Sequence, residues 1–392
     1  MRETLSSDEV KNLIQSVFSL KPEDKKLAII VDVPDERIPD NEKWMQRREI
    51  AGDWHRKLLA VKNELGLEQT DLIYYPNVNS NNADLPKTAY FFDGNPRQIN
   101  ASTLSLKKTD FEFEKKLAEY QIIVAPTQFS ATAPLKLLAK KYLFRAATMP
   151  GFSEDMIPAL KLDYEEINRR VNEIKKYLDK AIGIDISFST IDNNNYHIYF
   201  DLRFRNAHTS GGRFPDSGTA GNLPSGECYI VPYEGEKGEK SLSSGVLPVQ
   251  FGETIVLYQI EENVAKKVLS EGKKSFEERQ KFTAEPAYGN IAEIGFGVLQ
   301  DFGVQPTGEI LLDEKLGLHI AFGRSDHFGG VIGVKDFSKP ENVVHIDRIY
   351  IPETQSKIIP EKVELTYENK QKFTLMIKGK YTIFNYFPTY SK

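Results

Sequence analysis

The sequence has a single cysteine, Cys228, among 392 residues. An internal disulfide framework is therefore excluded, and so little cysteine is typical of a reducing compartment. No apolar stretch approaches the ~18 residues that a membrane-spanning helix needs. The first twenty residues mix charges and lack the apolar core of a signal peptide. These absences predict a cytoplasmic protein with no membrane partner.

An excess of charge of one sign is also lacking. Lys and Arg number 51 against 56 Asp and Glu, which gives a net charge of −5, and no long basic run occurs. We therefore expect no nucleic-acid partner. A hydrophobic content of 40% and a charged content of 27% are typical of a soluble globular protein, and the length suits two domains.

The first half of the sequence alternates apolar runs with helical patterns. The runs at 27–33 and 121–126 are apolar apart from Asp32 and Gln121, which predicts strands buried on both faces, as in a parallel sheet. A charge-rich stretch at 41–65 is predicted to be a helix. A stripe of apolar residues spaced by three and four from Tyr164 to Leu178 predicts another. We predict an N-terminal α/β domain with a mostly parallel sheet over residues 1–182.

Beyond residue 183 the pattern changes to short segments of alternating apolar and polar residues. Residues 184–205 predict an antiparallel hairpin, and further short strands follow as far as 371–378. One helix, at about 261–271, is expected to interrupt them. The predicted fold class is α/β plus α+β, with a β-rich, metal-binding catalytic domain over residues 183–392.

Histidine is scarce, and half of it is concentrated in one stretch. Three of the six histidines, His319, His327 and His345, lie between residues 316 and 351. Asp347 follows His345 by two residues in a predicted strand, where such a spacing places both side chains on one face. An imidazole beside a carboxylate suits a divalent metal ion. His319 lies in an apolar strand, where a core histidine is the alternative to a ligand. His327 lies in a glycine-bounded loop. It is interpreted as a proton shuttle or a substrate contact, and a solvated side chain is the alternative.

Two glutamates lie in apolar strands, where a carboxylate is costly unless it is paired or bound to a cation. They are Glu227 and Glu293; pairing with Lys or Arg is the alternative to metal binding. With Asp347 they carry three negative charges, which two divalent ions and one bound hydroxide would balance, as in a two-metal hydrolase. A single metal held by His319, His345 and Asp347 would instead resemble a non-haem iron oxygenase.

Several segments together resemble the aminopeptidase T family of metallopeptidases. They are Asn222–Glu227, Ala292–Gly297, Gly308–Gly317, His319–Gly323 and His345–Asp347. The resemblance implies an N-terminal α/β domain, a C-terminal metal domain, a homodimer and two divalent ions, which would be zinc, cobalt or magnesium/manganese. It also implies metal-ligand roles for Glu227, Glu293, His319, His345 and Asp347.

The sequence departs from this family at one place. The peptidases carry a tyrosine after the first histidine motif, where this sequence has Arg324-Ser325-Asp326-His327. The same superfamily is similar to a dihydroxypyridine ring-cleaving dioxygenase that uses one iron. We predict a metal-dependent aminopeptidase acting on a peptide or small-molecule substrate, with Glu227, Glu293 or His327 moving the proton. The alternatives are a mononuclear iron ring-cleaving dioxygenase and a non-catalytic ligand-binding protein.

Overall fold

The structure is a computed structural model that describes residues 3–106 and 110–384. The chain divides into two compact units. The first contains Met1–Asn168, Ser210–Ser225 and Thr307–Leu312, and the second contains Arg169–Thr209, Gly226–Pro306 and Asp313–Lys392. Two short segments of the second half of the chain thus belong to the first unit. No helix of the described residues combines the length and the apolar character that crossing a bilayer requires.

The first unit is built on a mostly parallel sheet of seven strands. In spatial order they are β10 (Ala220–Asn222), β6 (Arg145–Thr148), β5 (Ile122–Ala125), β1 (Lys26–Val33), β2 (Gln69–Pro76), β3 (Thr88–Phe91) and β4 (Asp110–Glu112). The pairs from β10 to β2 are parallel, and β3 and β4 join antiparallel at one edge. The prediction of a mixed α/β fold with a mostly parallel sheet is confirmed.

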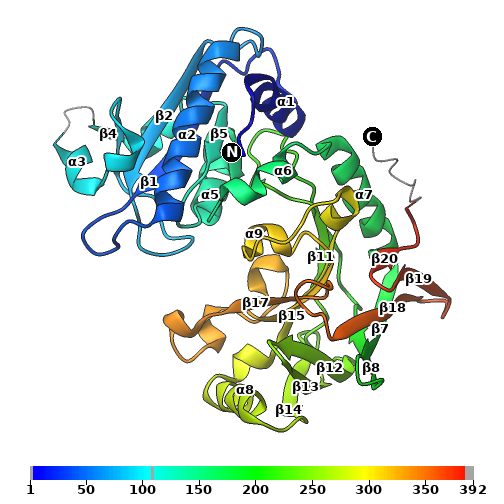
Figure 1. Cartoon of the computed structure of the whole chain (residues 1–392). Helices are drawn as coiled ribbons and strands as arrows, with labels where there is room; N and C mark the ends of the chain where they lie inside the picture. The colour runs from blue at the N-terminus through cyan, green and yellow to red at the C-terminus, as the bar shows by residue number, and fades with distance from the viewer. Residues whose placement is uncertain (1–2, 107–109, 385–392) are drawn as a thin grey trace. The chain divides into compact units, whose positions relative to one another are not determined.

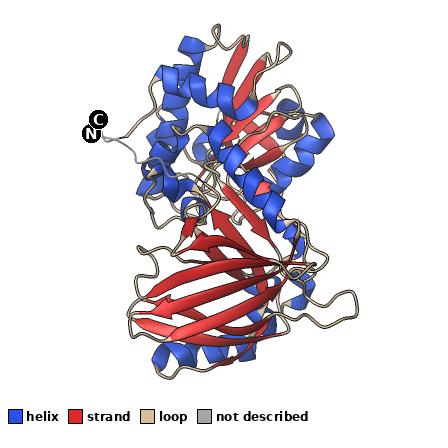
Figure 2. Cartoon of the chain, turned by 90° about the vertical axis from the view of Figure 1, so that its right-hand side faces the viewer, coloured by secondary structure: helices blue, strands red, loops and turns tan. Residues whose placement is uncertain are grey.

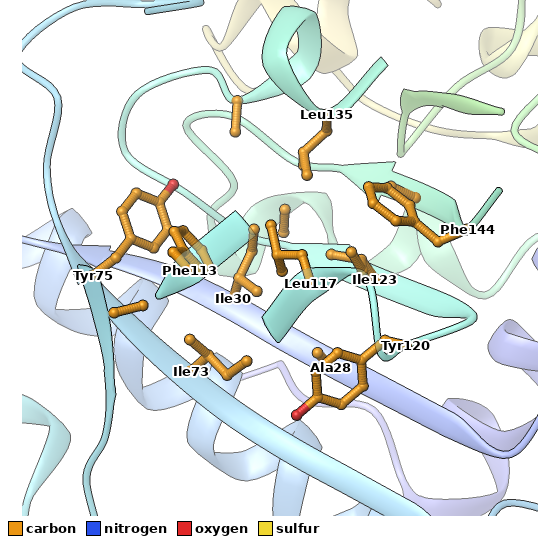
Figure 3. Close-up of a cluster of buried hydrophobic side chains, with 14 of the residues drawn as sticks. Ala28, Ile30, Ile73, Tyr75, Phe113, Leu117, Tyr120, Ile123, Leu135 and Phe144 are labelled. Carbon is orange, nitrogen blue, oxygen red and sulfur yellow. The ribbon is translucent and has the colours of Figure 1, made fainter. Parts of the chain in front are cut away.

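Helices cover both faces of this sheet, which explains why its central strands are mostly apolar. On one face, Ile30 of β1 and Ile123 of β5 pack with Leu117 and Leu135 (Figure 3). On the other, Ile29 lies with residues of α1 (Ser7–Phe18) and α2 (Glu42–Val61), the helix beside β1 in Figure 1. The remaining helices that begin in this unit are α3 (Ala101–Ser105), α4 (Phe113–Leu117), α5 (Thr132–Tyr142), α6 (Ile157–Leu160), α7 (Tyr164–Leu178) and α9 (Ile310–Asp313).

The second unit contains an antiparallel sheet of eight strands (strands are red in Figure 2). In spatial order they are β14 (Val264–Val268), β13 (Thr254–Glu261), β12 (Ser244–Phe251), β8 (Asn195–Asp201), β7 (Ala181–Thr190), β18 (Ile358–Tyr367), β19 (Lys372–Ile377) and β20 (Lys380–Tyr381). The predicted hairpin over 184–205 is confirmed as the pair β7 and β8.

The helix predicted at about 261–271 is wrong. Glu262 and Asn263 have φ angles of 52° and 67°, so the chain turns back there and continues as β14. Val264 and Val268 are four residues apart and imitate a helical stripe. In the structure Val264 is half-buried and Val268 is buried on β14, next to an irregularity in its pairing with β13. The helix, α8, spans Lys273–Ala284.

A second, five-stranded sheet of this unit carries the candidate site. Its spatial order is β17 (His345–Ile349), β16 (Leu318–Gly323), β15 (Ile291–Gly297), β11 (Glu227–Ile230) and β9 (His208–Ser210). The pairs between β17 and β11 are antiparallel. Strands β15 and β16 are buried along their whole length.

Candidate metal centre

The five predicted metal ligands come from four neighbouring strands of the five-stranded sheet. Strand β11 carries Glu227, β15 carries Glu293, β16 carries His319, and β17 carries His345 and Asp347. The antiparallel register places Ala321 between Glu293 and Asp347, and it pairs Gly295 with His319. Because alternate residues of paired strands share a face, all five side chains point to the same side of the sheet.

Small residues form the floor of this site. We use the term floor for Gly295, Gly297, Ala321 and Gly323, which lie on the same face between the ligands. A Cβ atom added at Gly295 would lie 1.8 Å from Nε2 of His319. The imidazole therefore lies across the backbone of β15, in space that only glycine leaves open. The alternation of Glu293, Gly295 and Gly297 along β15 is the sequence signal of this floor.

The ligand atoms form two groups that share Glu293. One atom each of Glu227, Glu293 and His319 lie within 4.8 Å of one another, and so do one atom each of Glu293, His345 and Asp347. Nε2 of His319 is 3.3 Å from Oε1 of Glu293, and Nε2 of His345 is 3.4 Å from its Oε2. The Glu293 carboxylate thus lies between the two imidazoles.

The outer nitrogen of each imidazole contacts a backbone carbonyl. Nδ1 of His319 is 3.1 Å from the Gly317 oxygen, and Nδ1 of His345 is 2.8 Å from the Arg324 oxygen. A carbonyl oxygen only accepts, so both Nδ1 atoms carry hydrogen and donate. The neutral form of each ring then presents the lone pair of Nε2 to the carboxylates. This orientation by a second partner is typical of metal-binding histidines.

Two carboxylate oxygens at the centre lack a hydrogen-bond donor among the described residues. They are Oε2 of Glu227 and Oδ1 of Asp347, and both atoms are buried. The nearest imidazole nitrogens are 3.4 and 3.7 Å away, in contacts that are not hydrogen bonds. A buried carboxylate oxygen without a donor is costly unless a cation neutralises it. The residues of the centre therefore fit a divalent metal ion.

The two imidazoles of the centre hold protons on the Nε2 atoms that would otherwise bind a metal ion. Burial would lower the pKa of His319 and His345, but Glu293 and the other carboxylates raise these values to about 9 and about 10. Burial would raise the pKa of Glu293, but contacts from both imidazoles hold it well below its usual range. Burial raises the pKa of Asp347 to about 6, against the attraction of His345. Each Nε2 proton therefore supplies a positive charge that a metal ion would replace.

The carboxylate of Glu227 has a second, fixed partner. Nζ of Lys315 donates to Oε1 of Glu227 at 2.5 Å, and it also donates to Glu314. Both carboxylates have pKa values raised by burial, against the attraction of Lys315. The pairing with lysine, the alternative to metal binding for this glutamate, is thus present on one of its two oxygens.

Aromatic side chains line one side of the centre. We call His208, Tyr229, His327 and Phe328 the aromatic wall. The Tyr229 ring stacks on His208 with centroids 5.5 Å apart and meets the edge of Phe328 at 4.9 Å. The rings of His327 and Phe328 both lie 5.3 Å from that of His345. His327, the predicted proton shuttle, thus lies beside the centre, and burial lowers its pKa to about 4.

Sequence reasoning missed four of the residues at this site. Tyr229 follows Glu227 by two residues, so strand periodicity could have placed it on the same face. His208 and Phe328 reach the wall from elements distant in sequence, and no spacing pointed to them. Lys315 precedes β16 by three residues, outside any strand pattern. The predicted ligands lie together in the structure, and their roles as ligands remain predictions.

No family model matches this sequence, and no curated protein matches it. Among solved structures, the chain is similar to that of 2,5-dihydroxypyridine dioxygenase from Pseudomonas putida KT2440, with a TM-score of 0.58. The sequences are 14% identical, and the match covers 97% of this chain and 99% of the other. At this identity the likeness shows a shared fold, and a fold alone does not fix a reaction.

This comparison corrects the predicted function. The metalloaminopeptidase prediction, with its hydrolase and protease chemistry, is wrong. The full-length structural neighbour is a dioxygenase, which agrees with the alternative of a ring-cleaving dioxygenase. The resemblance to the aminopeptidase T family and the homodimer that it implies remain predictions.

Proposed function

We propose that this protein is a metal-dependent dioxygenase that cleaves a small hydroxylated aromatic ring. The observation that carries the proposal is the geometry of two imidazoles whose Nε2 atoms both face Glu293, next to Asp347. An aromatic wall adjoins this group. The fold that holds it is shared with a dioxygenase over nearly the whole chain.

We propose a single ferrous ion, for which two ligand sets are compatible with the contacts. Glu293, His345 and Asp347 already present one atom each within 4.8 Å. His319, His345 and Asp347 are the set of two histidines and one carboxylate that non-haem iron oxygenases use. His345 and Asp347 belong to both sets, and Glu293 or His319 completes the coordination.

When bound, ferrous iron supplies one centre at which a substrate hydroxyl and dioxygen meet. In the net reaction one carbon–carbon bond of the ring breaks and both atoms of dioxygen enter the product. The four electrons that reduce dioxygen come from the substrate, so no external reductant is consumed. The substrate class is therefore an electron-rich ring with two hydroxyl groups.

The residues of the chain have separate tasks in this proposal. Tyr229 and Phe328 offer ring surfaces on which an aromatic substrate stacks, an interaction worth about 0.5–1.5 kcal/mol beyond area burial. His327 lies at the exposed rim, with 36% of its side chain accessible. Burial lowers the pKa of this ring to about 4, so it is neutral at neutral pH and accepts a hydrogen bond from a substrate hydroxyl without taking its proton.

A hydrogen-bonded network fixes the loop that carries His327 and Phe328. Glu234 accepts hydrogen bonds from the Ser325 hydroxyl at 2.6 Å and from the Val331 backbone N–H at 2.6 Å. Arg205 donates to the Gly329 carbonyl oxygen at 3.1 Å. The loop with His327 and Phe328 is thus tied down on both sides, which keeps the wall in place for ring binding.

Oxygen consumption tests the proposal. Metal-free protein is reloaded with ferrous iron under argon and mixed in an oxygen electrode with a panel of dihydroxylated pyridines and benzenes. We expect one dioxygen consumed per ring, with loss of the aromatic ultraviolet absorbance. His345→Ala should abolish both signals, and His197→Ala, which changes an imidazole 56% exposed on β8, should leave them unchanged. Iron binding without oxygen consumption on any ring would favour a non-catalytic ligand-binding protein.

A further inference from the structure

A buried ammonium group lies against one side of the candidate metal centre. Lys315 is 1% exposed, and its Nζ is shared between the carboxylates of Glu227 and Glu314. Glu227 also belongs to the ligand group with Glu293 and His319. Lysine is almost never fully buried unless it is paired. Here the partner is a side chain that a metal ion would otherwise use.

The backbone of Lys315 is held in place by β15 and the residues after it. Its carbonyl oxygen accepts a hydrogen bond from the Leu299 N–H at 2.8 Å. A Cβ atom added at Gly297 would lie 2.2 Å from the Lys315 carbonyl carbon, so the two backbones are in direct contact. The position of the ammonium group is therefore part of the fold and does not depend on a flexible loop.

Two ligand groups that share a carboxylate are what a two-metal centre requires. One group is compromised here, because Lys315 takes Oε1 of Glu227 and leaves only Oε2 for an ion. Among the described residues, no lysine or arginine forms an ion pair with the second group, Glu293, His345 and Asp347, whose carboxylates contact imidazoles. The two groups are therefore not equivalent as cation sites.

The net charge of the cluster alone does not distinguish one ion from two. The carboxylates of Glu227, Glu293, Glu314 and Asp347 carry four negative charges and Lys315 carries one positive charge, so one divalent ion leaves −1 and a second brings +1. The positions of the charges do distinguish them. A second ion bound by Glu227 would lie beside the Lys315 ammonium group, and like charges repel strongly in a buried site.

We propose that the Lys315 ammonium group takes the place of a second metal ion, so that the centre binds one divalent ion at the Glu293, His345 and Asp347 group. The inference rests on the proposed function only in treating the centre as metal-binding. Lys315 supplies a fixed positive charge to Glu227, but its ammonium group, unlike a metal ion, has no coordination position for a substrate.

Manganese titration of the metal-free, full-length protein tests this inference without turnover. Binding is followed by calorimetry, elemental analysis and electron paramagnetic resonance. We expect one Mn²⁺ per chain and the six-line spectrum of an isolated ion. Lys315→Met, which removes the charge and leaves an unbranched side chain one atom shorter, should bind two and show exchange broadening. Lys315→Arg, which keeps the charge, should bind one. Two ions in the unaltered protein, or one in folded Lys315→Met, would overturn the inference.

Glu227→Gln decides the question even where Lys315→Met does not fold. Because Glu227 serves the lysine and not the ion, this variant should bind one Mn²⁺ with an affinity within about threefold of the unaltered protein. A loss of about 100-fold or more would contradict the inference. The two experiments distinguish failure of the two proposals. One bound ion without oxygen consumption would contradict the proposed dioxygenase function. Two bound ions with oxygen consumption would contradict the proposed role of Lys315.

Discussion

Both units of the molecule bury carboxylates on strands, but the hydrogen bonds that these carboxylates accept differ between the two units. Asp32, 1% exposed on β1, accepts hydrogen bonds from the N–H groups of Gln128 and Phe129 at 2.7 and 3.0 Å and from the Trp44 indole at 3.1 Å. These donors are part of the fold. The Asp32 carboxylate therefore holds the loop after β5 against β1 without any ligand.

The carboxylates of the five-stranded sheet are buried to a similar degree but less completely satisfied. Oε2 of Glu227 and Oδ1 of Asp347 have no donor among the described residues, and an imidazole nitrogen lies 3.4 Å from the first and 3.7 Å from the second. The Asp32 carboxylate and the carboxylates of the candidate centre are thus both buried, but only the centre contains carboxylate oxygens that lack a hydrogen-bond donor among the described residues. The missing donor, and not burial itself, distinguishes a candidate binding site from a structural anchor.

Removing an imidazole from the centre should give the largest effect. We expect His345→Ala to weaken Mn²⁺ or Fe²⁺ binding by about 1,000-fold or more, close to 4 kcal/mol, because His345 belongs to both compatible ligand sets. Calorimetric titration measures the change. His197→Ala, an exposed histidine paired with Asp185, is the matched control and should bind normally. Equal metal affinity of the His345→Ala and His197→Ala proteins would contradict the proposed metal centre.

Removing the structural carboxylate should damage folding and leave the metal alone. Asp32→Ala leaves the backbone N–H groups of Gln128 and Phe129 without their acceptor, each costing about 1–3 kcal/mol when buried. The Trp44 indole keeps the backbone carbonyl oxygen of residue 32 as its acceptor. We expect a loss of about 3 kcal/mol in urea unfolding and an unchanged metal stoichiometry. Asp192→Ala, in an exposed turn, should stay within about 0.5 kcal/mol. A large loss of metal affinity in Asp32→Ala would contradict a purely structural role for Asp32.

Acid should weaken metal binding, because the Nε2 proton of a ligating imidazole has to leave before an ion binds. With His319 and His345 at pKa values of about 9 and about 10, both are protonated at neutral pH. Binding at the Glu293, His345 and Asp347 group releases one such proton, so the affinity should fall about tenfold for each pH unit on acidification. The set with His319 in place of Glu293 would release two and give about 100-fold. Titrations at pH 7.5 and 6.5 measure this slope, and proton release in buffers of different ionisation enthalpy gives the number of protons. A flat profile would contradict the protonated centre.

The same histidines give the metal-free protein the opposite dependence on pH. Their folded pKa values lie above the unfolded value of 6.5. Their contribution to stability is therefore complete below about pH 6.5 and is lost as the pH rises through about 9 to 10. Urea unfolding of the metal-free protein across this window should show the decline. His319→Ala should reduce it.

The smallest expected effect comes from one methyl group on the floor. Gly295→Ala would place a carbon 1.8 Å from Nε2 of His319, so the ring has to move. We expect metal affinity to fall about tenfold, close to 1.4 kcal/mol. Gly52→Ala in α2, where the nearest atom is 3.4 Å away, is the control and should be neutral or slightly stabilising. If Gly295→Ala binds metal normally, the floor does not set the position of His319.

Periodicity in the sequence identified the elements, and through them the ligands. The continuous apolar run at 27–33 predicted a central parallel strand, and the spacing of His345 and Asp347 placed both on one face. Periodicity failed where two periods coincide, as at Val264 and Val268, which suit a helix or a bulged strand equally. It also could not assign Lys315 to Glu227, because that contact joins residues 88 positions apart through a loop. Pairing across such distances depends on the assembled sheet.

The floor of glycine and alanine has a consequence for how this protein could be altered. Its residues lie on β15 and β16, which are buried along their whole length, so a larger side chain there has nowhere to go. The aromatic wall is different, because part of it lies on a loop between strands. Engineering for a different ring should therefore begin at Phe328 and its neighbours, where side chains can change size while the sheet beneath keeps its shape.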